Sequence, residues 1–188
     1  VGTDAGGLNL LDEKTNTFTR FVHNQQDSSS LSHNEVRVVL EDSNHKLWVG
    51  TRNGICKLDR ANGKFIKYPL KYRDSRLVSD DYIMCLFEDS EKRLWAGTAS
   101  RGLFLFDEEK AEFRQFVETI GDVKGIFSRS VFAIEEDHEG NLWVGTENGG
   151  LLIFNFSTGE KSHYVYDKSD PFSISNNSIY EIYKDSRG

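Results

Sequence analysis

The chain has few of the residues that mark disulfide-rich or membrane-spanning proteins. Its 188 residues include two cysteines, two prolines and one methionine. Cys56 and Cys85 form no CxxC pair and no metal-ligand spacing, so we expect two small, partly buried apolar side chains. No apolar run approaches the roughly 18 residues that a bilayer-spanning helix needs. The sequence therefore predicts no direct membrane contact in this segment.

The charge balance also excludes a class of partner. The chain carries 23 Lys and Arg against 30 Asp and Glu, which gives a formal net charge of −7. A nucleic-acid-binding surface needs clustered Lys and Arg, and the sequence contains no basic stripe. We therefore expect no nucleic-acid partner. No signal peptide is visible, and because the first residue is Val, we expect an excerpt or a processed product.

What the sequence does contain is one phrase written four times. "LWVGTENGG" at Leu142–Gly150 recurs as "LWVGTRNG" and "LWAGTASRG", and the chain opens with "VGTDAGG". The glycine of each Gly-Thr pair stands at Gly2, Gly50, Gly97 and Gly145, in steps of 48, 47 and 48 residues. The apolar positions around it keep the same step, with Lys161 as the one mismatch at a position that is otherwise Phe.

A fixed period of about 40–50 residues indicates a solenoid or a propeller. Each unit contains four short β-rich segments joined by Gly, Asn and Asp turns, such as "EVRVVLED", "LWVGT", "GICKLD" and "FIKYP". We call these segments strands A, B, C and D. Four antiparallel strands per unit are typical of a propeller blade, so the fold class is all-β, a β-propeller segment of four blades. The repeats run over about 1–47, 48–94, 95–142 and 143–188, within a single propeller region 1–188.

The recurring Trp and Gly have a packing interpretation. A Trp side chain is a large plate that fills the space between neighbouring sheets, and the Gly two residues later leaves room where the next blade comes close. The turn glycine that follows permits the positive φ of a tight hairpin. The alternative is that the tryptophans are sugar-stacking platforms, but equivalent residues in every repeat are more often core. The structural repeat residues are Trp48, Gly50, Trp95, Gly97, Trp143 and Gly145.

At these residues the chain resembles the two-component regulator propeller repeat. The match runs through "EDHEGNLWVGTENGGLLIFNFSTGEKSHYVYDKSDPFSISNNSIYEIYKD", Glu136–Asp185, and it recurs over the whole chain. Arg101 departs from the pattern at a turn glycine, and "GIFSRS" replaces the S-x-x-N loop of the third unit. The resemblance implies the periplasmic sensor region of a bacterial hybrid two-component system, which responds to an oligosaccharide and signals to a histidine kinase outside this chain.

The ends of the chain leave the closure of the ring open. A strand A is expected at Ser178–Asp185 without a strand B after it, while Val1–Thr3 has no strand A before it. Four blades could close on themselves, two chains could combine into one ring, or the chain could be an arc of a larger ring. The resemblance favours the arc. Self-association is expected as one way to cover the open edges.

A search for catalytic chemistry is largely negative. The chain has no G-x-S-x-G elbow and no H-E-x-x-H, and its five histidines fall at unlike repeat positions. "DHEGN" at Asp137–Asn141 is too short for a calcium loop, so its Asp is expected to cap a turn, as Asp42 and Asp89 would. The recurring Glu-Asp pairs are expected to be structural. The sequence thus predicts no enzyme, no catalytic residue, no metal and no cofactor.

The positions that vary between repeats are the candidates for ligand binding. Four lie just inside strand A and four immediately before it, while the neighbouring core positions stay apolar. They are Asn34, Arg37, Asp81, Met84, Arg129, Phe132, Asn177 and Tyr180. Aromatic faces, guanidinium groups and amides of this kind could stack on a sugar ring and bind its hydroxyl or acidic groups. The alternative is that they are ordinary channel-lining and loop residues.

The loops before strand A bear on the choice of function. They span Asn24–His33, Lys71–Asp80, Glu118–Ser128 and Asp167–Asn176, and each occupies the same place in its repeat. An enzyme usually needs one blade with a specialised loop, so this uniformity favours a binding or structural role. We expect a ligand-sensing propeller. The alternatives are a propeller lyase or glycan hydrolase, and a scaffold that mediates dimerisation without binding a ligand.

Overall fold

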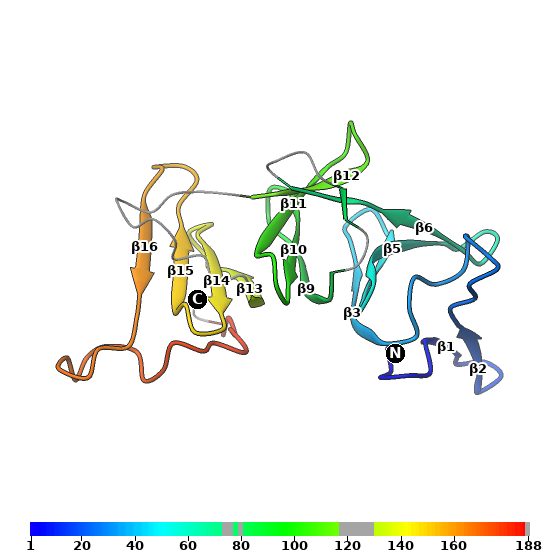
Figure 1. Cartoon of the computed structure of the whole chain (residues 1–188), viewed down its shortest axis with the longest axis horizontal. Coiled ribbons are helices and arrows are strands. Elements are labelled where there is room, and N and C mark those ends of the chain that lie inside the picture. The colour runs from blue at the N-terminus through cyan, green and yellow to red at the C-terminus, as the bar shows by residue number, and fades with distance from the viewer. Residues whose placement is uncertain (73–76, 79–80, 117–129, 187–188) are drawn as a thin grey trace.

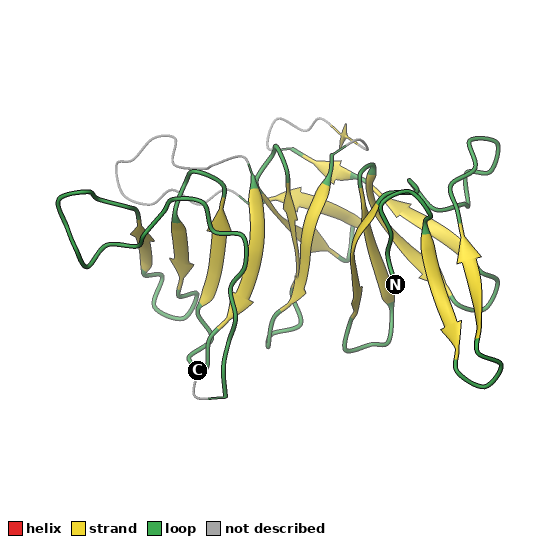
Figure 2. Cartoon of the chain, turned by 90° about the horizontal axis from the view of Figure 1, so that it is seen from below, coloured by secondary structure: helices red, strands yellow, loops and turns green. Residues whose placement is uncertain are grey.

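The computed structural model describes residues 1–72, 77–78, 81–116 and 130–186. The described residues contain β-strands and turns and no helix, so none of them forms a membrane-spanning helix. Four antiparallel sheets stand side by side in an open row, from β1 and β2 at one end to β13–β16 at the other (Figures 1 and 2). The all-β propeller segment expected from the period is confirmed, and the row is an open arc.

The bounds of the strands follow the repeat. The first sheet pairs β1 (Leu8–Asp12) with β2 (Thr17–Phe21). The second contains β3 (Val36–Glu41), β4 (Leu47–Thr51), β5 (Gly54–Asp59) and β6 (Lys64–Tyr68). The third contains β9 (Ile83–Glu88), β10 (Leu94–Thr98), β11 (Leu103–Asp107) and β12 (Glu112–Gln115), extended by β7 (Leu70–Lys71) and β8 (Leu77–Val78). The fourth contains β13 (Val131–Glu136), β14 (Leu142–Thr146), β15 (Leu151–Phe154) and β16 (Lys161–Tyr164).

The Gly of the repeated phrase lies where neighbouring blades touch. A Cβ built on Gly50 would lie 2.7 Å from Ile83 Cγ2, an atom of the first strand of the next blade. A Cβ on Gly97 would lie 2.7 Å from Val131 Cγ1 in the same way. Real Cβ atoms do not approach carbon atoms this closely, so only glycine lets the strand A of one blade pack directly on the strand B of the blade before it. The role predicted for these glycines is confirmed.

The tryptophans fill the space between blades, as expected. Trp48 and Trp95 are each only 1% exposed. The Trp48 ring lies 4.9 Å from Tyr68 of its own blade, and 5.1 and 5.8 Å from Phe106 and Phe113 of the next blade. Such tilted and edge-to-face contacts are the preferred geometry of aromatic pairs. Trp143 is less buried, because among the described residues no complete blade follows it.

The third sheet is larger than a four-stranded blade. After β6 the chain crosses to the next blade, where β7 pairs in parallel with β12, with Leu70 opposite Phe113. Pro69 O accepts a hydrogen bond of 2.9 Å from Phe113 N, and Leu70 is fully buried. The preceding loop does the same, since Ser29 O accepts from Phe65 N at 2.7 Å. Each described connection between blades therefore covers the outer edge of the next sheet, which removes an exposed strand edge.

The two ends of the arc differ from the regular blades. Ser178–Asp185 is not a strand, so the strand A predicted there is wrong as secondary structure, because no strand B lies beside it to form a ladder. The segment nevertheless occupies the strand A position: Ile179 N donates to Thr146 O at 2.9 Å, and Ile179 packs on Gly145. At the other end, Val1–Thr3 contributes one isolated bridge, Gly2 to Leu8, beside β1.

Candidate functional site: the inner-strand row

Three of the four candidate residues just inside strand A lie at bulges of the innermost strands. The pairing of β3 with β4 shifts register between Val36 and Val38, which leaves Arg37 without a partner in the ladder. The pairing of β13 with β14 shifts around Phe132 in the same way. In β9, Ile83 and Cys85 pair with Thr98 and Gly97 and skip the residue between them, Met84. A bulge leaves its extra residue outside the ladder and re-aims its side chain.

We call Arg37, Met84, Phe132 and Tyr180 the inner-strand row. The structure brings two of its members into contact, because the rings of Phe132 and Tyr180 stack at 5.4 Å with 19° between their planes. Phe132 is half-buried, whereas Tyr180 is 69% exposed. Arg37 is exposed and Met84 is half-buried. The row therefore offers a flat aromatic face, a thioether and a guanidinium along neighbouring innermost strands.

The candidates immediately before strand A are anchored to the frame. Their carbonyl oxygens accept hydrogen bonds from hairpin glycines of the preceding blade. These bonds are Gly7 N to Asn34 O, Gly54 N to Asp81 O and Gly150 N to Asn177 O, at 2.8–2.9 Å. The side chains are engaged too, since Asn34 Oδ1 accepts from His23 N and Asn177 Oδ1 from Tyr166 N, both at 2.6 Å. Arg129, the fourth candidate of this set, lies outside the described residues.

Asp81 explains a departure from the repeat. Its side chain is 3% exposed, accepts a hydrogen bond of 3.1 Å from Ser100 Oγ and lies 3.3 Å from Arg101 Nε. Arg101 is the residue that replaces a turn glycine in the third unit. Its guanidinium also lies 5.0 Å from the Tyr72 ring centroid. A buried carboxylate needs such a partner, so the Asp and the Arg form one local unit.

Polar groups of both signs interact beside the start of β3, two residues before Arg37. Glu35 forms an ion pair with Arg52 at 3.2 Å, and its carboxylate accepts a hydrogen bond from the Tyr82 hydroxyl. Burial and this hydrogen bond raise the pKa of Tyr82, while the same hydrogen bond holds the pKa of Glu35 below its ordinary value. Tyr82 is therefore a neutral phenol beside a carboxylate, and it remains a hydrogen-bond donor at neutral pH.

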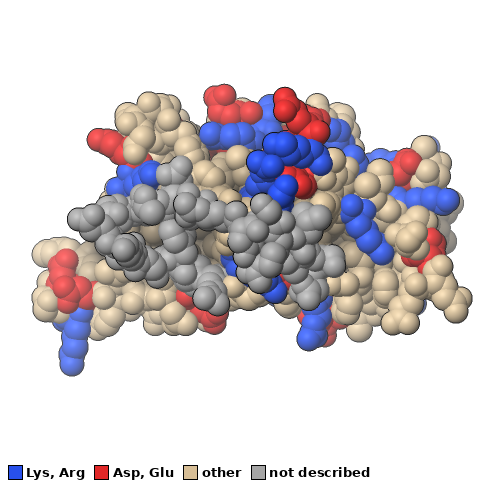
Figure 3. Space-filling view, turned by 45° about the horizontal axis from the view of Figure 1, so that its top comes forward, with Lys and Arg blue, Asp and Glu red and all other residues tan. Residues whose placement is uncertain are grey.

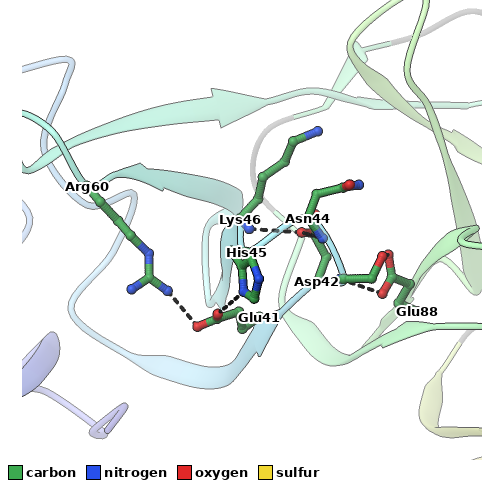
Figure 4. Close-up of polar contacts among 8 residues, drawn as sticks. Glu41, Asp42, Asn44, His45, Lys46, Arg60 and Glu88 are labelled. Atoms are coloured by element: carbon green, nitrogen blue, oxygen red, sulfur yellow. Dashed lines mark hydrogen bonds and ion pairs between the residues drawn. The ribbon is translucent and has the colours of Figure 1, made fainter.

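The recurring Glu-Asp pairs have structural work, as predicted. Asp42 caps its turn, with Oδ1 accepting from Asn44 N and Lys46 N, and its Oδ2 accepts from the Trp48 indole at 2.8 Å. Glu88 belongs to the next blade and accepts from Ser43 N and Ser43 Oγ at 2.7 and 3.0 Å (Figure 4). Asp42 therefore stabilises the turn of its own blade, while Glu88 binds the preceding blade through Ser43.

The histidines serve the frame rather than a shared site. His23 Nδ1 lies 2.7 Å from Leu31 O, and His163 Nε2 lies 2.6 Å from Gly149 O. His45 Nδ1 lies 3.0 Å from Glu41 Oε1 in an exposed pair (Figure 4). In the described part of the chain, no three His, Cys, Asp or Glu residues are arranged to hold a metal ion. The face drawn in Figure 3 carries Lys and Arg intermixed with Asp and Glu.

The fold and the inner-strand row define a segment of a β-propeller, and the sequence comparison gives the family. The model of the two-component regulator propeller matches residues 30–53, 77–100 and 125–148. Three segments of this chain, one in each of three repeats, are therefore similar to the two-component regulator propeller. The described part of each matched range contains strand A and strand B, which pack against each other between neighbouring blades. The comparison with curated proteins gives no match.

Solved structures resemble the chain as a whole. The extracellular domain of a "putative one component system" of B. thetaiotaomicron is 26% identical with a TM-score of 0.77, over 97% of this chain and 23% of that one. A second structure of the same extracellular domain, described as that of a "putative hybrid two component system", is 25% identical with the same TM-score, over 95% and 22%. PorZ of Porphyromonas gingivalis, a surface component of the type-IX secretion system, shares the fold at 14% identity, a TM-score of 0.67 and 97% and 27% coverage. In both structures the chain spans less than a quarter of that B. thetaiotaomicron domain.

Proposed function

We propose that this chain is part of the ligand-sensing propeller of an extracytoplasmic sensor of the hybrid two-component type. The single observation that carries the proposal is the set of three family matches, in register with the blades of the structure. The likeness to extracellular domains of signalling systems supports the extracytoplasmic location. The proposed role is to bind a ligand without chemical turnover and to pass its presence to a histidine kinase outside this chain.

We propose an oligosaccharide as the ligand and the inner-strand row as its contact surface. The stacked rings of Phe132 and Tyr180 offer a flat apolar face, and the hydrophobic face of a sugar ring packs well on such a surface. Arg37 adds a forked donor for hydroxyl or carboxylate oxygens. Asn34, Asp81 and Asn177 support this surface through the frame, because their side chains already have partners within the protein.

Self-association is the second part of the proposal, and it would involve the two ends of the arc. Phe18 and Leu10 are 61% and 49% exposed at one end, and Tyr183 is 84% exposed at the other. Large apolar side chains exposed at this level favour contact with another protein surface. Light scattering should give the mass of a dimer. A monomer at every concentration would rule this part out without affecting the ligand proposal.

Calorimetric titration with purified oligosaccharides tests the ligand proposal. The panel should include neutral and uronic-acid-containing hexasaccharides. Phe132→Ala and Tyr180→Ala should each weaken binding about tenfold, which corresponds to the roughly 1.4 kcal/mol expected from the loss of one stacking contact. Tyr164→Ala is the matched control, because it removes an exposed aromatic ring from β16, the strand of the fourth sheet that is most distant from β13. Equal affinity in all four proteins would place the ligand elsewhere.

A further inference from the structure

A second candidate site lies at a junction between blades where the residues differ from those at the preceding junction. A groove of about 520 Å³ lies at the end of β9 and β13 opposite to the inner-strand row, where the A–B turns and a C–D turn meet. We call it the junction groove and define it by Glu91, Arg93, His138, Glu139, Phe156 and Ser157. It lies between the third and fourth sheets. Since packing needs recur at every junction, residues that differ at one junction are the ones that packing does not dictate.

The central pair of the groove, Arg93 and Phe156, differs in chemistry from the equivalent pair at the preceding junction. At the preceding junction the equivalent positions hold Lys46 and Glu108, which form an exposed ion pair of 3.4 Å. At the junction groove the same two positions hold Arg93 and Phe156, and the guanidinium carbon lies 4.3 Å from the ring centroid. The salt bridge between the second and third blades thus has a cation–π contact as its counterpart between the third and fourth blades. The cation–π contact also joins two neighbouring blades, and Phe156 adds a flat aromatic surface to the groove.

The pair is held rigidly on its inner side. Arg93 Nε donates to Asp89 Oδ2 at 2.6 Å, and the ring of Phe156 stacks on the fully buried Trp95 at 5.7 Å with 14° between planes. Phe156 is nonetheless 36% exposed. The terminal nitrogens of Arg93 have no hydrogen-bond partner among the residues that the structure describes. Preorganised donors and a fixed ring reduce the entropy lost when a ligand binds.

The rim of the groove determines which ligand chemistry fits. Glu91 and Glu139 offer carboxylate acceptors, and His138 stands where the other junctions have Ser43 and Ser90. Charges of both signs disfavour a ligand that is strongly anionic or strongly cationic. A neutral molecule with many hydroxyl groups satisfies all of these groups at once, because hydroxyls donate to carboxylates, accept from guanidinium and leave apolar C–H faces for the ring.

We propose that the junction groove binds a neutral polyhydroxylated ligand, a saccharide unit, with Phe156 as the platform and Arg93 as the donor. The site is separate from the inner-strand row and does not rest on the proposed sensor role. Residues such as Glu136, whose carboxylate accepts from Ser90 N and Ser90 Oγ at 2.9 Å, hold the blades together beneath it.

Amide NMR spectra of the whole chain test the proposal, with cellohexaose, maltohexaose and mannohexaose as probes. At least one probe, at up to about 10 mM, should shift the amides of Phe156, Ser157 and Gly140, since this concentration detects millimolar affinity. The variant R93K/F156E rebuilds the Lys–Glu pair of the preceding junction, so it should fold normally and bind at least tenfold more weakly. Phe132→Ala should leave these shifts unchanged, which separates this site from the inner-strand row.

Three results would overturn the proposal. Two of them are the absence of shifts at the groove with all three neutral probes, and equal shifts in the wild type and R93K/F156E. The third is stronger binding of a sulfated chondroitin hexasaccharide than of any neutral probe, because the carboxylates at the rim should repel it. The converse variant K46R/E108F gives a gain-of-function check, since it should transfer neutral-probe shifts to the preceding junction.

Discussion

Trp95 donates its indole N–H to Asp89 Oδ2 over 2.8 Å, and both side chains are almost completely buried. The same bond of 2.8 Å joins Trp48 to Asp42 and Trp143 to Asp137. The Trp side chain that packs between two blades is thus hydrogen-bonded to the turn that precedes its own strand. An indole N–H buried without an acceptor costs free energy, so the Asp six residues before each Trp belongs to the packing motif.

Asp89→Ala should lower the free energy of unfolding by about 3 kcal/mol, because it leaves a buried indole N–H and the guanidinium of Arg93 without their acceptor. Urea unfolding followed by tryptophan fluorescence measures the change. Asp4→Asn, at an exposed position, is the control and should stay within about 0.5 kcal/mol of the wild type. Equal unfolding midpoints for Asp89→Ala and the wild type would contradict this role of the carboxylate.

Gly97→Ala should be severely destabilising, because its Cβ would overlap Cys85 Sγ and lie 2.7 Å from Val131 O. We expect a loss of more than about 3 kcal/mol, or no folded protein. Gly102→Ala is the matched control: its new Cβ meets no atom within 4 Å, and only the φ of +85° opposes it. That strain costs about 1 kcal/mol. If both variants melted at the same temperature, close blade contact would not be what excludes a side chain at Gly97.

The Ser–Glu contacts between blades predict an order of effects. Glu136 is 7% exposed and fastens Ser90, whereas Glu88 and its partner Ser43 lie at a more exposed junction. Glu136→Ala should therefore cost about 2 kcal/mol, and Glu88→Ala about 1 kcal/mol or less. Hydrogen exchange should show faster exchange of the Ser90 amide in the first variant. Unchanged protection of that amide would show that the carboxylate is dispensable for this contact.

The turn aspartates predict a pH dependence of stability. Burial raises the pKa of Asp42, but hydrogen bonds from Trp48, Lys46 and Asn44 outweigh it and leave the pKa below its ordinary value. Burial also raises the pKa of Asp137, but hydrogen bonds from Asn141 and Trp143 outweigh it and leave this pKa below its ordinary value. A carboxyl whose pKa is lower in the folded state stabilises the fold above its ordinary pKa of about 4, and this contribution is lost as the pH falls further.

Unfolding midpoints measured across the acidic range test this dependence. The wild type should lose stability steadily below about pH 4, and Asp42→Asn should show a shallower loss from a lower starting value. Asp4→Asn, at an exposed position, is the control for the substitution itself. A variant Asp42→Asn with an unchanged slope would mean that other groups control acid unfolding.

The sequence predicted the features that each blade repeats for itself. The period predicted the strands of the complete blades, the buried tryptophans and the turn glycines. These glycines have φ between +76° and +85° at Gly7, Gly54, Gly102 and Gly150. The bond between Asp42 and Trp48 was also within reach, because the spacing of six residues recurs in each complete unit. The period and the alternation of apolar residues indicate the packing within one blade, so that part of the structure was predictable.

Relationships between blades were not predictable in the same way. The parallel pairing of β7 with β12 joins residues 43 positions apart, and no local pattern signals it. The contact between Arg93 and Phe156 joins two units and appears only once. The bulges at Arg37 and Phe132 arise from the ladder itself, so the sequence marked these residues as variable without showing that they leave the ladder.

Native mass spectrometry of the chain mixed with the oligosaccharide panel tests the central claim most directly. A sensor propeller without turnover should form a complex whose mass equals the chain plus one or more intact oligosaccharides, and Phe132→Ala and Tyr180→Ala should reduce the complex at the inner-strand row. Shortened or dehydrated oligosaccharides, or the absence of any complex across the panel, would contradict the account.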